Sequence, residues 1–311
     1  AIFKLYSLGI STNRDEWLYD FNHETLTRKV RHLVSIYGEV PTTTEAFPET
    51  IKWSETLKRR KCSRQLESYD AQLITTAAYR PFVKLYLYQS ILFVDRPGLS
   101  YDLFPPNADN RAICFSDVGS RANYCVQAVD GLADLHFGAA VDGYQQVARY
   151  RYVGSERIDN ITDWALQQFI DHFGKGAGVT KDGIFAYVYA VLNDPVYRET
   201  YALDLKREFP RIPFYADFAR WRDWGQALLD LHIGYEAVEL YPLRRTDVPD
   251  RKARAAEQAP RPILKSDRAA GLVVVDSETQ LAGVPGEAWD YVLGNRSAID
   301  WVLDQHKERK P

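Results

Sequence analysis

Cationic side chains recur in the short turns between Tyr79 and Arg121. Turn sequences such as Arg-Pro, Asp-Arg-Pro-Gly and Val-Gly-Ser alternate here with short apolar and aromatic runs. The cations are Arg80, Lys84, Arg96, Arg111 and Arg121. A guanidinium at the end of a strand has a rigid support, and its fork of donors matches a phosphate or the O6/N7 edge of guanine. The pattern predicts a DNA-contacting surface, unless each arginine merely caps a turn and pairs with a nearby aspartate.

Four residues are the candidates for reading base edges. Arg96 and Arg121 each sit in a tight turn with a glycine two residues away, which permits close approach of the backbone to a partner. Asp95 and Asp117 are placed to orient the two guanidiniums. Asn13 and Arg14 occupy the tip of an earlier turn. That turn is equally compatible with a plain Asn-Asp turn carrying a solvated arginine.

A second group of residues is expected to hold phosphates. Its members are Lys58, Arg59, Arg60, Lys61, Arg80, Arg111 and Ser120. The run 58–61 is also compatible with the solvated end of a helix. Residues 242–268 carry eight Lys and Arg against four acids, so they are predicted to form a mobile basic loop that also contacts phosphates.

The elements that must position these side chains are predicted from periodicity. Strands are expected at 83–88, 90–94 and 112–116, and again within 124–155. Residues 1–21 are predicted to form strand, turn and strand, and residues 23–37 an amphipathic helix. From about Asp159 the pattern is helical, with a helix break at Asn193-Asp194-Pro195, a hairpin within 271–284 and a terminal helix.

These elements predict an α+β fold. A strand-rich, DNA-facing part at residues 1–155 would pack on a helical support at residues 156–311. The support would include the basic loop 244–268, the hairpin 271–284 and the terminal helix. The chain begins within a predicted strand, which suggests a piece of a longer polypeptide.

Composition limits the kind of nucleic-acid binding that can be expected. The net charge is −3, which disfavours a protein that binds DNA tightly through charge alone and requires a local positive face instead. Cys62, Cys114 and Cys125 show no metal-type spacing and suit a reducing cytoplasm. No apolar run is long enough for a membrane span.

Motifs for independent catalysis are absent from the sequence. It contains no Walker A loop, no G-x-G-x-x-G, no H-E-x-x-H, no G-x-S-x-G and no N-P-P-Y motif. We therefore expect no catalytic residue, no metal site and no cofactor in these 311 residues.

Several stretches together resemble one protein family. They include GISTNRDEWLYDF, IKWSETLKR, YRPFVKLYLY, NRAICFSDVGSR, DNITDWALQQF, IFAYVYAVLNDPVYRETYA, FPRIPF, LDLHIGYE and YVLGNRSAIDWVLDQH. Their order resembles the C-terminal specificity region of type ISP restriction-modification enzymes, which combine nuclease, helicase-like ATPase, adenine methyltransferase and target recognition in one polypeptide. The resemblance covers nearly the whole chain.

The resemblance implies that the chain recognises a short sequence in double-stranded DNA beside an N6-adenine methyltransferase. The methyltransferase and ATPase domains would lie upstream in the same polypeptide and would be its protein partners. S-adenosylmethionine, ATP and Mg would belong to those upstream parts.

Two other classes of function remain open from the sequence. The aromatic helices could form a docking surface that couples ATPase and methyltransferase with little DNA contact. A stand-alone hydrolase would need a polar pocket with a perturbed carboxylate or histidine. DNA binding that depends on sequence and salt separates the recognition module from the coupling module.

Overall fold

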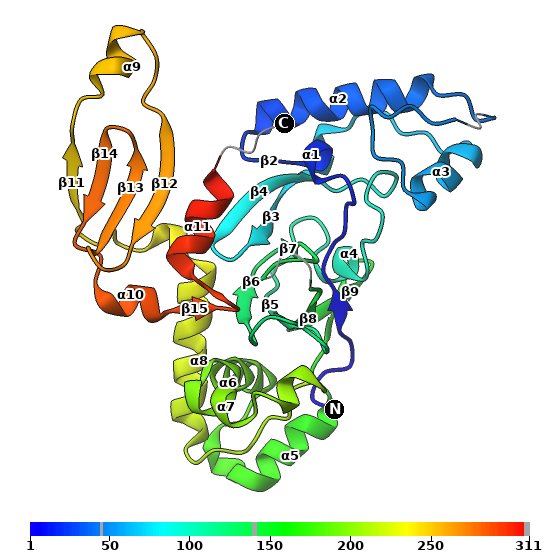
Figure 1. The fold of residues 1–311 in the computed structure, drawn as a ribbon. Helices are drawn as coiled ribbons and strands as arrows, with labels where there is room; N and C mark the ends of the chain where they lie inside the picture. The colour runs from blue at the N-terminus through cyan, green and yellow to red at the C-terminus, as the bar shows by residue number, and fades with distance from the viewer. Residues whose placement is uncertain (44–45, 139–141, 308–311) are drawn as a thin grey trace.

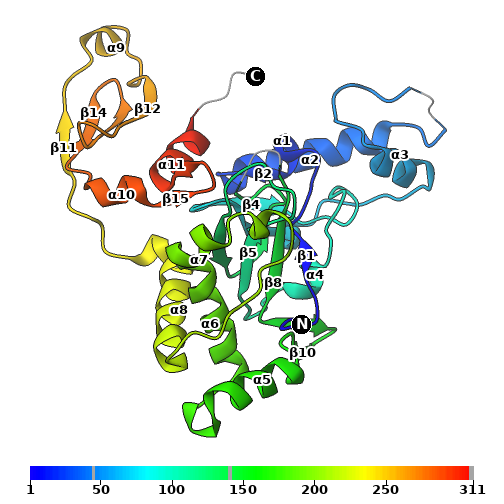
Figure 2. The same ribbon diagram turned by 60° about the horizontal axis from the view of Figure 1, so that its bottom comes forward.

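The computed structural model describes residues 1–43, 46–138 and 142–307. Two central sheets lie between a long helix on one side and a group of helices on the other (Figure 1). A third sheet stands apart from this body, next to the C-terminal helix, in both ribbon views (Figures 1 and 2).

The first central sheet has the order β2-β4-β3-β7. Its strands are β2 (Tyr19–Asp20), β3 (Ile74–Arg80), β4 (Val83–Tyr88) and β7 (Leu132–Ala133). Helix α2 (His23–Glu39) begins at Asn22, whose side chain accepts a hydrogen bond from the Thr25 amide, and buries Leu26, Val30 and Leu33 in the same core. The short helices α1 (Asp15–Leu18), α3 (Glu55–Cys62) and α4 (Ser100–Leu103) and the 3-10 turn Ala71–Leu73 complete this part.

The second central sheet is buried on both faces. Its order is β1-β8-β5-β6, from β1 (Ser7–Leu8), β8 (Tyr144–Ala148), β5 (Ala112–Ser116) and β6 (Val126–Val129). Alternate residues of β5 face opposite cores: Cys114 joins the core under the first sheet, and Ile113 and Phe115 join the helical core. β9 (Tyr150–Val153) and β10 (Glu156–Asp159) form a hairpin with a two-residue turn at 154–155.

The helical part contains α5 (Asp163–Phe173), α6 (Lys181–Asn193), α7 (Pro195–Thr200) and α8 (Phe218–Ile233), with 3-10 turns at Lys175–Ala177, Asp204–Lys206 and Tyr235–Ala237. Helices α6 and α8 approach closely at Gly225, where a Cβ atom would lie 1.8 Å from the Ala186 carbonyl oxygen. Any larger residue at position 225 would force these helices apart.

The last part of the chain builds a small module. Its sheet has the order β11-β14-β13-β12, from β11 (Arg244–Asp247), β12 (Pro262–Asp267), β13 (Leu272–Asp276) and β14 (Thr279–Ala282), with α9 (Arg251–Ala255) between β11 and β12. One face packs through Val273 and Leu281 onto a small core around Trp289. The chain then forms α10 (Gly286–Asp290), β15 (Val292–Leu293), β16 (Arg296–Ser297) and α11 (Ala298–His306).

The predicted α+β class, with a strand-rich first half packed on a helical second half and a late hairpin, is confirmed. Three local predictions are wrong. Of the strand predicted at the end of residues 1–21, residues 16–18 belong to α1 and only Tyr19–Asp20 form a strand, β2. Residues 90–94 form a turn in which the Ser90 hydroxyl accepts from the Leu92 and Phe93 amides. Much of the predicted loop 244–268 forms β11, α9 and β12, because β13 and β14 offer edges that pair with it.

Candidate nucleic-acid interface

The turn that carries Arg96 is held rigidly while its arginine is exposed. Arg96 and Ser11 exchange backbone hydrogen bonds of 3.0 and 2.9 Å. Gly98 has a φ of +57°, and a Cβ atom there would lie 2.6 Å from the Ser7 hydroxyl. The sequence predicted that this glycine lets the backbone come close to a partner. In the structure the Gly98 backbone instead comes close to Ser7 of the same chain. Among the described residues, the guanidinium of Arg96 has no hydrogen-bond partner and faces solvent.

Asp95 does not orient Arg96, contrary to the prediction. Its carboxylate accepts from the Arg14 guanidinium and the Ser54 hydroxyl, both at 2.8 Å, and from the Asn13 amide at 3.1 Å. Burial alone would raise the pKa of Asp95, but these hydrogen bonds and the charge of Arg14 lower it on balance.

Arg14 lies inside the protein. Its side chain is 0% exposed and also donates to the backbone carbonyls of Thr12 and Phe93. A buried guanidinium with satisfied donors cannot reach a base edge from this position. The prediction that Arg14 reads bases is therefore corrected, whereas Asn13 is exposed at the tip of the turn with a φ of +60°.

Arg121 occupies a second exposed loop. Its Nε donates to the Asp142 carboxylate at 3.0 Å, and its side chain is 70% exposed. Asp142 also accepts from the Arg121 and Ala122 amides and from the Ser120 hydroxyl. Burial would raise the pKa of Asp142, but these donors lower it overall. The orienting carboxylate is thus Asp142, and not Asp117 as predicted.

A cleft of about 600 Å³ opens beside the turn that carries Arg96, which is bridged to Ser11 in the cleft wall. Its lining includes Ser11 and Asn13, beside the Arg96 turn, and His136, whose ring contacts the carbonyl oxygen of Asp142 at 3.2 Å. It also contains acids and tyrosines: Asp15, Glu16, Asp20, Asp134, Tyr19 and Tyr79. The candidate interface therefore combines exposed cations with a cleft that is rich in acids, two of which are paired with Lys29 and Arg80.

Asp134 forms the buried end of this cleft. It is 2% exposed, and its Oδ1 accepts from Arg80 at 2.6 Å and from the His136 amide at 2.9 Å. Burial raises the pKa of Asp134 to about 6, although Arg80 opposes the rise. The carboxylate is therefore ionised at neutral pH but is costly to keep charged.

The basic run on α3 divides into exposed and buried residues. Arg59 is exposed, and Lys58 pairs with Glu55 on the surface at 2.8 Å. Arg60 donates to the carbonyls of Leu92 and Val94, at 2.8 and 2.9 Å. Lys61 is 1% exposed and donates to the Tyr37 carbonyl at 2.6 Å. The predicted phosphate contact from Lys61 is therefore corrected, because its ammonium is buried over α2.

The remaining predicted phosphate contacts are engaged within the protein. Arg80 is 8% exposed and paired with Asp134, so it is not available to DNA in this arrangement. Arg111 joins β5 to α8 through Asp230 at 2.8 Å and is half-exposed. Ser120 is buried against Asp142.

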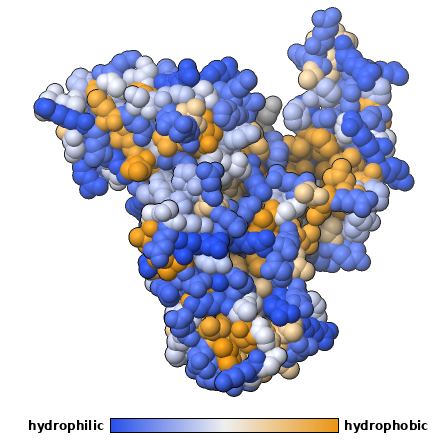
Figure 3. All heavy atoms as spheres, turned by 180° about the vertical axis from the view of Figure 1, so that it is seen from behind, coloured by the Kyte–Doolittle hydropathy of each residue, from blue (hydrophilic) through white to orange (hydrophobic). Residues whose placement is uncertain are grey.

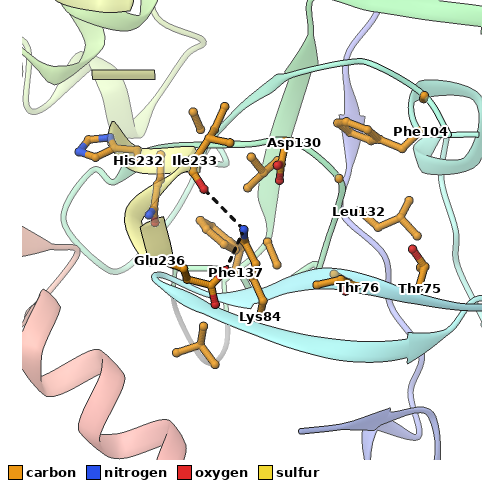
Figure 4. A pocket seen from close by; sticks show the side chains of 18 of the residues that line it. Thr75, Thr76, Lys84, Phe104, Asp130, Leu132, Phe137, His232, Ile233 and Glu236 are labelled. Atoms are coloured by element: carbon orange, nitrogen blue, oxygen red, sulfur yellow. Dashed lines mark hydrogen bonds and ion pairs between the residues drawn. The ribbon is translucent and has the colours of Figure 1, made fainter. Parts of the chain in front are cut away.

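A second cavity, of about 440 Å³, lies where β3 and β4 meet the end of α8 (Figure 4). Lys84 reaches from β4 to the Ile233 carbonyl at 3.5 Å and to Glu236 at 3.3 Å. His232 lies beside it between the hydroxyls of Tyr189 and Tyr291, at 2.5 and 3.0 Å, and burial lowers its pKa to about 4. These contacts join the strand-rich part to α8. The lowered pKa of His232 therefore follows from its burial in this structural contact and does not require a catalytic role.

An apolar groove of about 470 Å³ opens on the other side of the helical part. It lies between α6 and α8 and is bordered by Trp221, Trp224 and Leu231. Trp224 is 46% and Leu231 50% exposed, which is unusual for such large apolar side chains.

Sequence reasoning missed the acidic cleft. Its members stand in two stretches, 15–20 and 134–136, that the pairing of β3 with β7 and the bridge between Ile10 and Asp134 bring together. The only local signal was the density of acids in Asp-Glu-Trp-Leu-Tyr-Asp at residues 15–20. In the described part of the chain, no group of three or more His, Cys, Asp and Glu could hold a metal, and no helix is suited to cross a membrane.

The comparisons with known proteins identify the family. The model of the Type ISP C-terminal specificity domain matches residues 1–311. The chain belongs to this family. No curated protein matches the chain.

Solved structures agree with the family assignment. A cryoEM structure of a DrdV–DNA complex is 40% identical, with a TM-score of 0.93 over 100% of this chain and 32% of that one. A nuclease-deletion mutant of the Type ISP restriction-modification enzyme LlaGI, in complex with a DNA substrate mimic, is 25% identical, with a TM-score of 0.83 over 100% of this chain and 29% of that one. The ATP-dependent enzyme LlaBIII bound to DNA shares the fold, at 21% identity and a TM-score of 0.87, over 100% of this chain and 21% of that one. The chain thus spans about a third of these structures or less.

Proposed function

We propose that this chain recognises a specific sequence in double-stranded DNA as the non-catalytic specificity part of a restriction-modification polypeptide. The observation that carries the proposal is the 40% identical structure, which is a complex with DNA. The exposed Arg96 on a rigid turn supports it, because a fixed guanidinium can contact guanine O6 and N7 together.

The partners and cofactors follow from this role. The chain would position an adjacent N6-adenine methyltransferase on its site, and the ATPase would belong to the same polypeptide. S-adenosylmethionine, ATP and Mg would bind those other parts, since the motifs that hold them do not occur in this sequence. The cytoplasm is the expected setting, because the DNA lies there.

The test is a paired measurement of Arg96→Ala on two duplexes at one fixed salt concentration. The target duplex would first be obtained by selection from random sequences with the wild-type chain. We expect Arg96→Ala to lose about 1–3 kcal/mol of binding free energy on the target and much less on a scrambled duplex.

Lys175→Ala is the matched control, because Lys175 is exposed in the 3-10 turn that follows α5 and does not line the cleft. It should leave both affinities unchanged. Arg121→Ala extends the test to the second loop, with melting temperatures recorded because Arg121 also holds Asp142. Equal losses on both duplexes for Arg96→Ala would remove this arginine from sequence reading.

A second candidate function is favoured by the apolar groove at Trp224 and Leu231. Such a groove suits a coupling surface for another domain of the polypeptide. A chain that selects no DNA sequence, but whose association with the methyltransferase part is lost in Trp224→Ala, would support this alternative.

A further inference from the structure

The acidic cleft beside Arg96 contains hydrogen-bond acceptors that the fold does not use. Asp15 and Asp20 are engaged: Asp15 accepts from the Tyr79 hydroxyl at 2.9 Å, and Asp20 pairs with Lys29 at 2.9 Å. Glu16 differs from them, because it is exposed at the cleft and has no ion pair within the described residues. Its carboxylate is therefore available to a ligand.

One buried group that lines the cleft is incompletely satisfied. Tyr19 is 4% exposed, and its hydroxyl has no hydrogen-bond partner among the residues that the structure describes. Asp134 is 2% exposed and is already engaged, because its Oδ1 accepts hydrogen bonds from Arg80 and from the His136 amide. A buried polar group without a partner is costly, so the Tyr19 hydroxyl, which can donate and accept a hydrogen bond, indicates a polar ligand in the cleft.

Charge around the cleft restricts the class of that ligand. Arg96 lies on the turn that bridges Ser11, Lys52 lines the cleft, and Arg121 is linked to it through Asp142 and His136. A lysine or arginine from another protein would meet repulsion from these cations. Duplex DNA brings phosphates for the surrounding cations and base amino groups for the acids.

Among the bases, cytosine fits an acidic reader best. In the major groove cytosine presents its N4 amino donor, guanine and thymine present acceptors, and adenine places the N7 acceptor beside its N6 donor. A carboxylate that approaches adenine is therefore repelled by N7. The geometry points to Glu16 as a specificity residue that accepts a hydrogen bond from the N4 amino group of a cytosine in the target, beside the unpartnered Tyr19 hydroxyl. This inference rests on the proposed function and assigns one base of the recognised sequence.

The experiment selects bound duplexes from a random-sequence library with the wild-type chain, Glu16→Ala and Glu16→Gln. The wild type should prefer cytosine at one position. Glu16→Ala should lower that preference about tenfold and leave the other positions unchanged. Glu16→Gln should move the preference at that position toward adenine, because a glutamine amide matches adenine N6 and N7.

Glu24→Gln is the matched control, since Glu24 is an exposed acid in the first turn of α2 that does not line the cleft. It should select the wild-type sequence. Wild-type selection by both Glu16 variants would overturn this inference and leave the proposed function standing. Failure of the wild-type chain to select any sequence would overturn the proposed function, and this inference with it.

Discussion

At the scale of the residue, Arg14 and Arg96 show how two nearby arginines acquire different roles. Asp95 binds Arg14 and leaves Arg96 exposed, although Arg96 is its neighbour in sequence. Arg14 therefore fixes the turn that carries Asn13, and Arg96 projects from a turn bridged to it at Ser11. Stability and DNA contact are divided between the two side chains.

Replacing Arg14 tests this division. Arg14→Met should lower the free energy of unfolding by about 3–5 kcal/mol, because Asp95 then remains charged without its buried partner. Urea denaturation followed by circular dichroism measures the loss, and Arg96→Met is the control expected to change stability little. A stable Arg14→Met protein with weakened target binding would restore Arg14 as a base reader.

His232 predicts how stability depends on pH. Burial lowers its pKa from 6.5 to about 4, so its contribution is complete above pH 6.5 and is lost as the pH falls toward 4. From pH 7 to pH 5 this contribution should decrease by about 2 kcal/mol.

Asp134 acts in the opposite direction over the same range. Its pKa is raised to about 6, so its stabilising contribution is present at low pH and is lost as the pH rises through 6. The informative quantity is therefore the difference in unfolding free energy between wild type and His232→Gln at each pH. That difference should narrow by about 2 kcal/mol from pH 7 to pH 5, and a constant difference would contradict the assignment.

At the scale of the element, α3 presents cations in two directions. Ser54 caps its first turn by accepting from the Leu57 amide, and Leu57 is buried, which fixes the rotation of the helix. Arg60 and Lys61 then point to backbone carbonyls, while Arg59 points outward. A basic run on a helix cannot act as one uniform surface, because successive residues are about 100° apart.

Arg59 and Arg60 should therefore behave differently when they are replaced. We expect Arg59→Ala to weaken binding to all duplexes by the same factor. It should also lower the slope of log affinity against log salt concentration by about one, because one phosphate is then no longer neutralised. Arg60→Ala should instead lower the melting temperature, since two buried carbonyls lose their donor. An unchanged salt slope for Arg59→Ala would place α3 outside the interface.

Elements with strong periodicity could be predicted from the sequence, and those defined by distant contacts could not. Helix 23–37 and strand 112–116 carry their own pattern and occur as α2 and β5. The run 90–94 is apolar enough for a strand, but Ser90 closes it into a turn and its apolar residues pack inward without a sheet. The acidic cleft depends on Asp134 meeting Asp15 across more than a hundred residues, which no local pattern reveals.

At the scale of the whole molecule, the β11–β14 module forms a separate lobe. Seen from behind, it and the part that contains α2 and α3 rise on either side of a hollow (Figure 3). One face of its sheet is packed through Val273 and Leu281, so the residues that alternate with them lie on the opposite face. Register places Arg244 and Lys265 on this opposite face, through the pairs Arg244–Ala282, Ala282–Leu272 and Val274–Lys265.

The open face of the module is a candidate for phosphate contact. Arg244 and Lys265 are exposed and form no ion pair within the described chain, unlike Arg245, Arg254 and Arg268, which pair with Asp247, Glu278 and Asp290. Charge that is not neutralised by the protein releases counterions when it meets DNA. The phosphate binding predicted for residues 242–268 can thus be tested at Arg244 and Lys265, which lie on strands of a sheet and not in a loop.

The double change Arg244→Gln with Lys265→Gln should lower the salt slope of binding by about two, at about 0.9 for each phosphate that the variant no longer neutralises. The selected DNA sequence should stay the same, because interactions with phosphates carry no base information. The matched control is Lys175→Gln with Arg207→Gln, which removes two exposed charges from the helical part and should leave the slope unchanged. If the salt slope falls equally in both double variants, only the overall charge of the chain matters. If the slope is unchanged in the Arg244→Gln/Lys265→Gln variant, the β11–β14 module contacts the rest of the polypeptide and not DNA.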